Sequence, residues 1–580
     1  MDTKKNTMSS QDTKKIEKEL SAFLHKKFGD KVKIISPSPA TNPKKIIGND
    51  VSKNQVINFA MKPKELIDYL DQYVVKQKQA KSVLATKICT HFNRIRHSQA
   101  TGEGLTKITG NIKSNILMLG PTGIGKTYLI KLIAKKIGVP FIKADATKFS
   151  ETGYVGKDVE DLIRDLVKEA NDDIELAQCG IIYIDEIDKI AASPNVIGAQ
   201  VSRTGVQRAL LKPMEETEVD LKVAHDPVSM MQELEAYQRT GSRTKRSVNT
   251  SNILFIVSGA FSYLSEIIKK RLTKQNIGFN AIPIKSKNTN DLLKLAQTED
   301  LVEFGFESEF IGRIPVRCTL ETLSENDLYD ILKMPNNPVI LSKRMDFSAY
   351  GIKIVFDNNS LKLLSKRAYE ENTGARGLVS IVEQALLDFE ESLPSLKTKR
   401  LCVSKQLLEN PEAYLQKLKK KEDSLEFKKE YEKAFNEQKK NIAQNLKENW
   451  NLYSKNYALS KSNALYNLIA SYYCKTVVEI EDAVKKIKEF YDKIKDVEVE
   501  ISKEYNLNII FNEDAIHFLI EQFIYYNVLK DDILEQIHNN FFDGLNLIRE
   551  KTNKNRFFIS KCDFLNPETY LNNLIKKEIK

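Results

Sequence analysis

Residues 120–127 read Gly120-Pro121-Thr122-Gly123-Ile124-Gly125-Lys126-Thr127 and fit the pattern Gly-x-x-x-x-Gly-Lys-Ser/Thr of a phosphate-binding loop. An apolar run precedes this phosphate loop and a helical stretch follows it, which is the context that the motif requires. Its glycines let backbone N–H groups wrap around phosphate oxygens at a helix N-terminus, where negative charge is stabilised. Lys126 is expected to reach the β- and γ-phosphates of a nucleotide, and the Thr127 hydroxyl to bind Mg²⁺.

A second apolar run ends in two carboxylates. Ile181–Ile184 reads as a buried strand, and Asp185 and Glu186 follow it. Burying a charge is costly unless the charge has a partner. Asp185 suits coordination of Mg²⁺, directly or through water, and Glu186 can polarise the water that attacks a γ-phosphate. The alternative is that both acids only cap the next helix.

Three apolar runs separated by helical stretches predict a parallel sheet with helices on both faces. They are Asn115–Leu119, Gly180–Ile184 and Asn252–Val257. Residues 320–415 read as helix, short strand, two helices and a final strand, which predicts a smaller α+β domain. A chain of 580 residues is too long for one hydrophobic core. We expect a flexible segment at 1–60, a large nucleotide-binding domain at 61–317 and a small domain at 318–415.

The remaining chain, 416–504 and 505–580, is expected to be a mainly helical extension. Two apolar stripes at helical spacing, Phe427 to Trp450 and Ile480 to Ile494, predict an antiparallel helical hairpin in its first part. The second part repeats the small domain: Tyr350–Phe356 is echoed by Tyr505–Phe511, and Asn410–Leu415 by Asn566–Leu571, at offsets of 155 and 156 residues. We infer a duplication of the small domain, with the hairpin between the copies.

Composition excludes several classes of protein. No run of about 18 apolar residues offers a membrane span, and the start, Met1 to Lys15, shows no secretory signal, so we expect a cytoplasmic protein. The net charge of +11 is spread over interspersed basic (89) and acidic (78) residues, which disfavours nucleic acid as the main partner. Six single cysteines lack zinc spacing and are expected to be buried thiols.

A series of ordered motifs between about Pro63 and Leu415 resembles the ClpX family of AAA+ unfoldases, and two of the stretches lean toward its relative HslU. The ClpX-like stretches are Leu70–Val75 with Gln77, the phosphate loop, Ala144–Gly156, Ile181–Lys189, Phe310–Pro315 and Thr373–Leu378; the HslU-like ones are Ser202–Arg208 and Ile253–Phe261. The resemblance implies an α/β P-loop AAA+ ATPase fold with a small α+β lid domain, ATP and Mg²⁺ as cofactors, and a homo-hexameric ring. It also implies that unfolded or tagged protein substrates are threaded through a central pore and delivered to a ClpP-like peptidase.

The resemblance assigns roles residue by residue. Val74 and Val75 match the adenine pocket, although Lys76 stands where the family has glycine. Arg313 matches an arginine that reaches the neighbouring subunit's γ-phosphate, and Arg376 a sensor arginine; with Glu186 they form the expected catalytic set. The expected nucleotide contacts are Val74, Val75, Pro121, Thr122, Gly123, Ile124, Gly125, Lys126, Thr127, Tyr128 and Asp185, with Thr127 and Asp185 on Mg²⁺.

Two loops are expected to meet proteins. In Gly153–Gly156, Tyr154 and Val155 resemble the pore loop that grips substrate; a buried loop tyrosine is the alternative. Val201–Gly205 is a candidate second pore loop. Ile277, Gly278 and Phe279 sit where the family carries the tripeptide that docks on ClpP, and an apolar loop tip is a plausible anchor.

The sequence departs from the family pattern in three places. No zinc-binding segment precedes the ATPase domain, so the usual adaptors are not expected to be recognised. Glu215–Thr250 is long and carries Arg239, Arg243, Lys245 and Arg246, which would attract acidic tails or form a solvated charge run. In the second copy of the small domain Asp531 replaces Arg376, so this copy is expected to recruit partners, brace neighbouring subunits, or only stabilise.

Two other functions stay open at this stage. A remodelling chaperone without a peptidase would share every nucleotide residue named above. A nucleic-acid motor is the second alternative, disfavoured by the pore tyrosine and by the lack of a DNA-binding motif. For the sensor at the end of the third strand, Ser258 is the small polar candidate.

Overall fold

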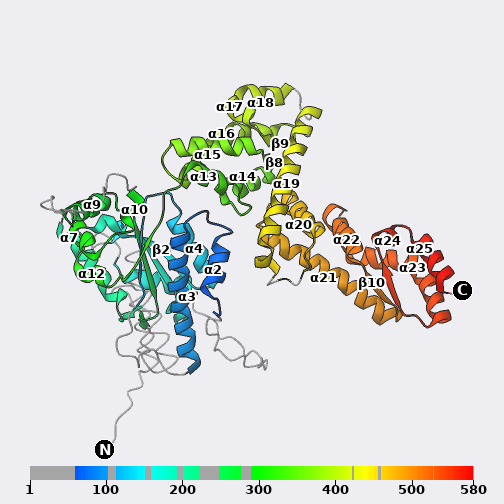
Figure 1. The fold of residues 1–580 in the computed structure, drawn as a ribbon, viewed down its shortest axis with the longest axis horizontal. Helices are drawn as coiled ribbons and strands as arrows, with labels where there is room; N and C mark the ends of the chain where they lie inside the picture. Colours follow the sequence, from blue (N-terminus) through cyan, green and yellow to red (C-terminus); the bar gives the residue numbers. More distant parts are fainter. Residues whose placement is uncertain are drawn as a thin grey trace, which may run out of the picture. The chain divides into compact units, whose positions relative to one another are not determined.

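The computed structural model describes residues 59–101, 113–149, 158–192, 200–221, 247–275, 289–420, 424–454, 457, 459–526 and 528–578. Apart from Phe59 and Ala60, the expected N-terminal segment 1–60 lies outside these residues. Three groups of elements follow one another along the chain and are named here the large domain (59–319), the small domain (325–420) and the extension (425–578). Figure 1 shows them as ribbons.

The large domain contains a five-stranded, all-parallel sheet of order β2-β3-β6-β1-β7. The strands are β1 (Ile116–Leu119), β2 (Phe141–Asp145), β3 (Ile181–Asp185), β6 (Leu254–Gly259) and β7 (Val316–Thr319). The three predicted strands are the central ones. The sequence did not reveal β2 and β7 because both are edge strands, half-exposed along most of their length and interrupted by Lys143 and Arg317.

Helices cover both faces of this sheet, as predicted. Alternate residues of each central strand point to opposite faces, so Ile116, Tyr183 and Ile256 belong to one hydrophobic cluster and Leu117, Ile182 and Val257 to another. The helices of the domain are α2 (Pro63–Leu70), α3 (Lys78–Thr101), α4 (Lys126–Ile137), α5 (Asp161–Glu169), α6 (Ile174–Ala177), α7 (Gln200–Met214), α9 (Leu264–Gln275), α10 (Thr289–Leu293), α11 (Thr298–Phe304) and α12 (Ser308–Gly312), with 3₁₀ turns η3 (Ala146–Lys148) and η4 (Ile187–Ile190) and an antiparallel pair, β4 (Glu218–Asp220) with β5 (Ser247–Asn249).

The small domain packs helices around one parallel pair of strands, β8 (Lys353–Phe356) and β9 (Arg400–Val403). Two helices precede β8 where the sequence predicted one, because Asn337 caps a new helix and Pro338 occupies its first turn. The helices are α13 (Glu325–Lys333), α14 (Pro338–Ala349), α15 (Asn358–Glu370), α16 (Ala375–Ser392), α17 (Lys405–Glu409) and α18 (Pro411–Lys420), with a 3₁₀ turn η6 (Leu393–Ser395).

The first part of the extension has three helices, so the prediction of a two-helix hairpin is incomplete. Helix α20 (Asn463–Lys475) follows α19 (Leu425–Ser454) and precedes α21 (Ile480–Tyr505) in the sequence, and it packs against both. Eight of its residues are buried, including Leu465, Tyr466 and Ile469, on more than one face. A helix that is apolar nearly all round has no single stripe, and this is why the sequence pattern did not reveal it.

The second part of the extension repeats the order of elements of the small domain. It runs β10 (Asn508–Phe511), α22 (Glu513–Tyr526), α23 (Lys530–Thr552), β11 (Arg556–Ile559), α24 (Lys561–Leu565) and α25 (Pro567–Glu578). Strands β10 and β11 pair in parallel from Asn508 opposite Arg556, as β8 and β9 pair from Lys353 opposite Arg400. These elements share one hydrophobic cluster with α19, α20 and α21, so the extension folds around a common core.

Across the described residues, no helix is both long and apolar enough to cross a membrane. All six cysteines of the sequence are described and none forms a disulfide. Cys89, Cys179, Cys318, Cys402 and Cys474 are buried, and Cys562 is exposed. Burial raises the pKa of Cys89, Cys179 and Cys474 to about 11 and that of Cys318 to about 12, so these thiols stay protonated at neutral pH.

Candidate nucleotide site

A cavity of about 610 Å³ lies between the large and the small domain. The large domain contributes the phosphate loop, the acids that follow β3 and the segment before α3; the small domain contributes residues of α13, α14 and α16. Of the predicted residues, those in its lining are Val74, Val75, Thr122, Gly123, Ile124, Gly125, Lys126, Thr127, Tyr128, Asp185, Glu186 and Arg376.

The phosphate loop folds back on its own lysine. Gly125 has a φ of 91°, a left-handed conformation that suits glycine, and it caps α4, which begins at Lys126. The Lys126 ammonium donates to the carbonyl oxygens of Gly120 at 2.6 Å and Pro121 at 2.9 Å. Burial lowers the pKa of Lys126, and the nearby carboxylates of Asp185 and Asp188 oppose this shift. A buried cation at a helix N-terminus is a natural partner for phosphate.

Two hard oxygen donors meet below the loop. The Thr127 hydroxyl lies 3.1 Å from Asp185 Oδ2. Mg²⁺ is usually held by one or two such protein oxygens together with phosphate oxygens of the nucleotide, so the pair fits the ion. The Lys143 ammonium, on β2, is 3.1 Å from the same carboxylate oxygen. The Asp185 carboxylate thus contacts both the Thr127 hydroxyl and the Lys143 ammonium.

The carboxylate of Asp185 is held on its other side by Ser258. Ser258 Oγ donates to Asp185 Oδ1 at 2.6 Å and lies 2.6 Å from the Tyr183 hydroxyl. Burial would raise the pKa of Asp185, but hydrogen bonds from Ser258, Lys143 and Thr127 outweigh it and the pKa lies below its ordinary value. The candidate sensor residue therefore touches the acid expected to bind the metal.

Glu186 lies in the cavity lining with an unusual backbone. Its φ is 59°, in the left-handed region that side-chain-bearing residues rarely occupy. Such strain costs on the order of 1–3 kcal/mol and persists where the surroundings impose it. Here Ile187 and Ile190 of η4 are buried directly behind it, so the turn that follows β3 is fixed by packing.

The phosphate loop touches the small domain directly. The amide of Ala375 donates to the carbonyl oxygen of Gly123 at 2.7 Å. A Cβ atom on Gly123, whose φ is 76°, would lie 1.9 Å from the carbonyl oxygen of Thr373. Only glycine fits at this contact, which places Arg376, in the first turn of α16, in the cavity lining.

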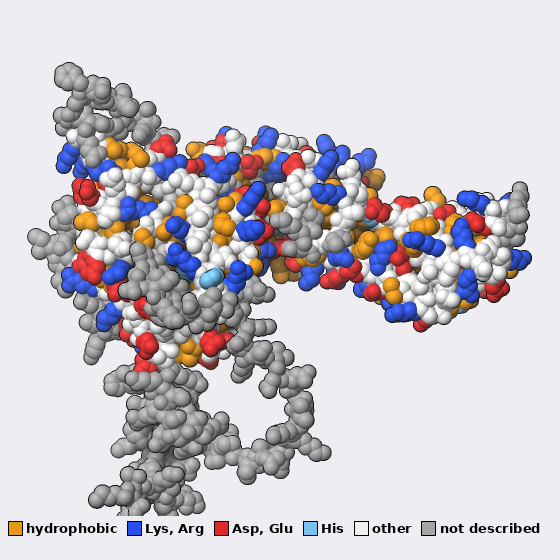
Figure 2. All heavy atoms as spheres, turned by 60° about the horizontal axis from the view of Figure 1, so that its bottom comes forward, with side chains coloured by type: hydrophobic (Ala, Val, Ile, Leu, Met, Phe, Trp, Pro, Cys, Tyr) orange, Lys and Arg blue, Asp and Glu red, His pale blue; other side chains and the backbone are white. Residues whose placement is uncertain are grey.

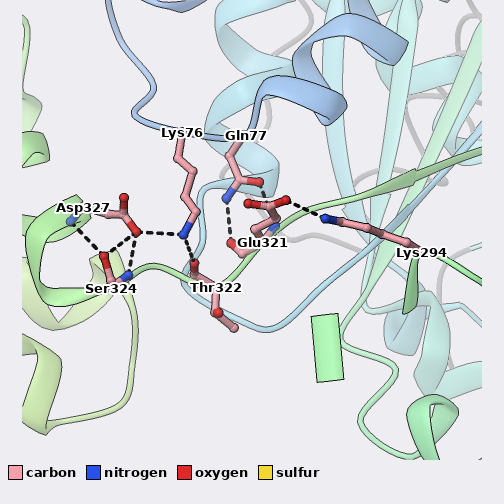
Figure 3. A network of polar contacts seen from close by, with 7 residues as sticks. All are labelled: Lys76, Gln77, Lys294, Glu321, Thr322, Ser324 and Asp327. Carbon is pink, nitrogen blue, oxygen red and sulfur yellow. Dashed lines mark hydrogen bonds and ion pairs between the residues drawn. The ribbon is translucent and has the colours of Figure 1, made fainter. Parts of the chain in front are cut away.

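A polar network fastens the two domains at the other side of the cavity (Figure 3). Lys76, with a φ of 60°, adopts the left-handed conformation for which the family uses glycine. Its ammonium donates to the Thr322 carbonyl oxygen at 3.0 Å and to Asp327 at 2.9 Å. Gln77 exchanges two hydrogen bonds, of 2.7 and 2.8 Å, with the backbone of Glu321. The lysine side chain thus links the segment before α3 to α13.

An apolar part of the lining lies next to this network. Tyr73, Val74 and Val75 from the large domain face it, together with apolar side chains of the small domain: Ile331, Met334, Val339 and Leu378. An apolar lining beside a phosphate-binding loop suits a nucleobase.

Some predicted residues lie elsewhere. Arg313 is absent from the cavity lining; its guanidinium pairs with Glu215 at 2.5 Å and its side chain is 47% exposed. Pro121 is also absent from the lining, and its carbonyl oxygen accepts a hydrogen bond from Lys126. The candidate pore-loop, docking and basic residues lie outside the described residues: Tyr154, Val155, Ile277, Gly278, Phe279, Arg239, Arg243, Lys245 and Arg246. The backbone of Val201–Gly205, predicted as a second pore loop, is part of helix α7.

Sequence reasoning missed several residues of the lining. Lys143 was not predicted because β2 has no continuous apolar run. Asp188 and Lys189 belong to the family-like stretch Ile181–Lys189, but the motif assigned roles only to the two acids directly after β3. Tyr73 directly precedes Val74 and Val75, so its place in the lining could have been predicted from the sequence. Met334 and Asn337 come from the unpredicted break between α13 and α14.

Comparison with known proteins finds matches for both domains that line this cavity. Residues 111–317 match the family model described as AAA domain (Cdc48 subfamily), and residues 323–389 match the C-terminal, D2-small domain of ClpB protein. The chain is 40% identical over 353 residues to the ATP-dependent Clp protease ATP-binding subunit ClpX of Treponema denticola, covering 60% of this chain and 81% of that protein. Its counterpart in Borrelia duttonii is 41% identical over 348 residues, or 59% and 77% of the two chains. The chain is an AAA+ ATPase and belongs to the ClpX family.

Proposed function

We propose that this chain hydrolyses MgATP to unfold protein substrates and thread them through the pore of a homo-hexameric ring, and that it delivers them to a ClpP-like peptidase. The observation that carries the proposal is the cavity between the two domains, whose lining contains Lys126, Thr127, Asp185, Glu186 and Arg376. A binding-only scaffold would not need this complete set.

Each residue has a step in the hydrolysis. Bound Mg²⁺ supplies charge neutralisation of the β- and γ-phosphates. Thr127 and Asp185 would hold it, and the Ser258 and Lys143 contacts keep the Asp185 carboxylate ionised and oriented. Lys126 binds the phosphates, and Glu186 polarises the attacking water. Arg376, brought to the phosphate loop by the Gly123–Ala375 hydrogen bond, stabilises charge on the transferring phosphate.

Arg313 fits a role in a ring. It lies outside its own chain's cavity and its guanidinium is half-exposed. An arginine supplied across a subunit boundary makes hydrolysis depend on assembly, because the charge on the γ-phosphate is stabilised only when the neighbour is present. The ion pair with Glu215 would then have to open when the neighbour's nucleotide arrives.

The test is ATP-dependent degradation of a tagged, folded reporter by the full chain together with the ClpP peptidase of the same source. We expect degradation that requires both proteins, and none with Glu186→Gln, which should still bind ATP. Strong ATP hydrolysis without ClpP-dependent degradation would overturn the peptidase part of the proposal and favour a stand-alone remodeller.

The Phe279→Ala variant separates docking from motor activity. It should lose degradation while ATP hydrolysis stays within about twofold, because an apolar anchor contributes to binding alone. The matched control is Val302→Ala, which truncates an exposed apolar side chain of α11 in the large domain and should leave degradation unchanged.

A further inference from the structure

The segment between α20 and α21, residues 476–479, joins the extension to both domains beside the nucleotide cavity. We call residues 476–481, which include the first two residues of α21, the bridge segment. Its neighbours on the large domain are Tyr73 and the last turn of α4, and on the small domain the break between α13 and α14. Tyr73, Met334 and Asn337, which belong to or border these contacts, also line the cavity.

The small-domain side of the contact is buried. Arg344, 5% exposed, donates through Nη2 to the carbonyl oxygens of Tyr473, Cys474 and Thr476 at 3.0–3.1 Å. Tyr473 and Cys474 lie in the last turn of α20, where carbonyl oxygens lack partners within the helix, and Thr476 is its C-cap. A cation at this position is also favoured by the helix dipole. The Tyr473 hydroxyl donates to Pro335 O at 2.7 Å, and Asn336 accepts from the Ile480 amide at 2.9 Å. The extension is therefore fixed to the small domain.

The large-domain side combines one part-buried hydrogen bond from Tyr73, which is buried, with two more exposed ion pairs. Glu479 accepts a hydrogen bond from the Tyr73 hydroxyl at 3.2 Å and pairs with Lys135 at 3.5 Å, and Glu481 lies 4.0 Å from Lys136. Lys135 is 67% and Glu479 39% exposed. Exposed pairs of this kind are weak and can open. They are made to the C-terminal end of the helix whose first residue is Lys126.

The two sides differ in strength, so the extension should follow the small domain while its contact with the large domain forms or breaks as the angle between the domains changes. Tyr73 directly precedes Val74 and Val75, and Lys76 and Gln77 after them are bound to Glu321, Thr322 and Asp327 (Figure 3). The stretch from Tyr73 to Gln77 is thus held at one end by the extension and at the other by the linker to the small domain.

We propose that Glu479 of the extension is a positioning residue of the nucleotide site: it holds Tyr73, and through it the apolar end of the cavity, in the form that binds nucleotide. The inference rests on the proposed nucleotide function of this cavity. Coupling of this kind is reciprocal, so bound nucleotide strengthens the contact between the bridge segment and the large domain.

The test is a double-mutant cycle on the full chain, with fluorescent N-methylanthraniloyl-ADP and Mg²⁺ as the probe. Glu479→Ala and Tyr73→Phe should each weaken ADP binding about 3- to 10-fold, and the double variant no more than the stronger single one, because both remove the same hydrogen bond. The KM for ATP should rise by the same factor while kcat stays within about twofold.

A matched control and a second readout separate positioning from a structural effect. Glu489→Ala removes a carboxylate from the same helix, where it forms an ion pair with Lys486, and should leave ADP affinity unchanged. In wild type, ADP should slow hydrogen exchange of the first turn of α21, and in Tyr73→Phe it should not.

The outcomes that overturn the inference differ from those that overturn the function. Additive effects in the cycle, or unchanged affinity in Glu479→Ala while the wild type binds ADP and hydrolyses ATP, would show that the extension is uncoupled from the site. A wild-type chain that binds no ADP would refute the nucleotide function itself.

Discussion

The chain carries the same six-element unit twice, and only one of the two copies reaches a nucleotide site. The units are β8 to α18 and β10 to α25, each with a parallel strand pair in the same register (Figure 1). In the first, α16 begins with Ala375 and Arg376 against the phosphate loop; in the second, α23 begins with Lys530 and Asp531. The fold is therefore independent of the chemistry, which depends on a few residues at one helix start.

The two copies lie in different surroundings, and this difference explains why only the first carries an arginine at the start of its second helix. The first copy presents the start of α16 to Gly123 across the domain boundary. The second packs on α21 and shares the core of the extension through Ile509, Phe541 and Phe557. A copy that contacts no phosphate loop needs the residues that form its fold, but it needs no arginine at the start of its second helix. Figure 2 shows one face of the molecule, on which lysine and arginine side chains are spread among acidic ones rather than gathered in one basic patch.

The largest expected effect comes from removing the arginine of the first copy. Arg376→Ala should lower kcat/KM for ATP about 100-fold or more, because an aligned charge is lost at the transferring phosphate. The equivalent change in the second copy, Asp531→Ala, should stay within twofold. Steady-state ATP hydrolysis measures both, and equal losses would show that the copies are not functionally distinct.

A smaller effect is expected at the contact between the first copy and the phosphate loop. Gly123→Ala should weaken ATP binding about tenfold, since left-handed strain costs roughly 1–3 kcal/mol and the new Cβ atom would meet Thr373 O at 1.9 Å. Gly138→Ala is the matched control: its φ is 77° but nothing lies within 4 Å of the added atom. Equal effects of the two substitutions on ATP affinity, measured by titration, would rule out the clash as the cause.

In the second copy, the packing of α23 on α25 can be tested in the same way. Gly544→Val should destabilise this contact by about 1–3 kcal/mol through overpacking, because even a single Cβ atom at Gly544 lies 2.7 Å from Leu571. Hydrogen exchange of Pro567–Glu578 should rise while ATP hydrolysis stays unchanged. Gly544→Ala should be milder, since the tip of Leu571 can shift. A fall in ATPase activity with Gly544→Val would link the second copy to the site.

The smallest expected effect is a pH dependence that distinguishes the second copy from the first. Burial lowers the pKa of His517 below its ordinary 6.5, against the pull of Glu513, Glu521 and Asp514. Its contribution to stability is complete above pH 6.5 and is lost as the pH falls through the lowered pKa. Residues 353–420 of the first copy contain no histidine.

Hydrogen exchange at pH 7.5 and 5.5, corrected for intrinsic rates, would measure this difference. Helix α22 should lose protection at the lower pH and α15 should not. His517→Gln should abolish the change, and equal losses in both helices would contradict the assignment to this histidine.

The nucleotide site was predictable where the sequence pattern is local and continuous. The phosphate loop, Asp185, Glu186 and Arg376 lie in the cavity lining as expected from their motifs. Lys143, Met334 and Asn337 were not predictable, because they reach the site through an edge strand without an apolar run and through a helix break at Asn337. Helix α20, the middle one of the three helices in the first part of the extension, was not predicted for a related reason: burial on several faces removes the periodic signal on which such predictions depend.

The distribution of thiols gives the second copy a site for selective chemical labelling. Five of the six cysteines are buried and Cys562, at the start of α24, is exposed. A maleimide dye added to the unmodified native chain should therefore attach to that one position. Fluorescence anisotropy of such a conjugate would follow the tumbling of the extension during ATP turnover without any engineered cysteine.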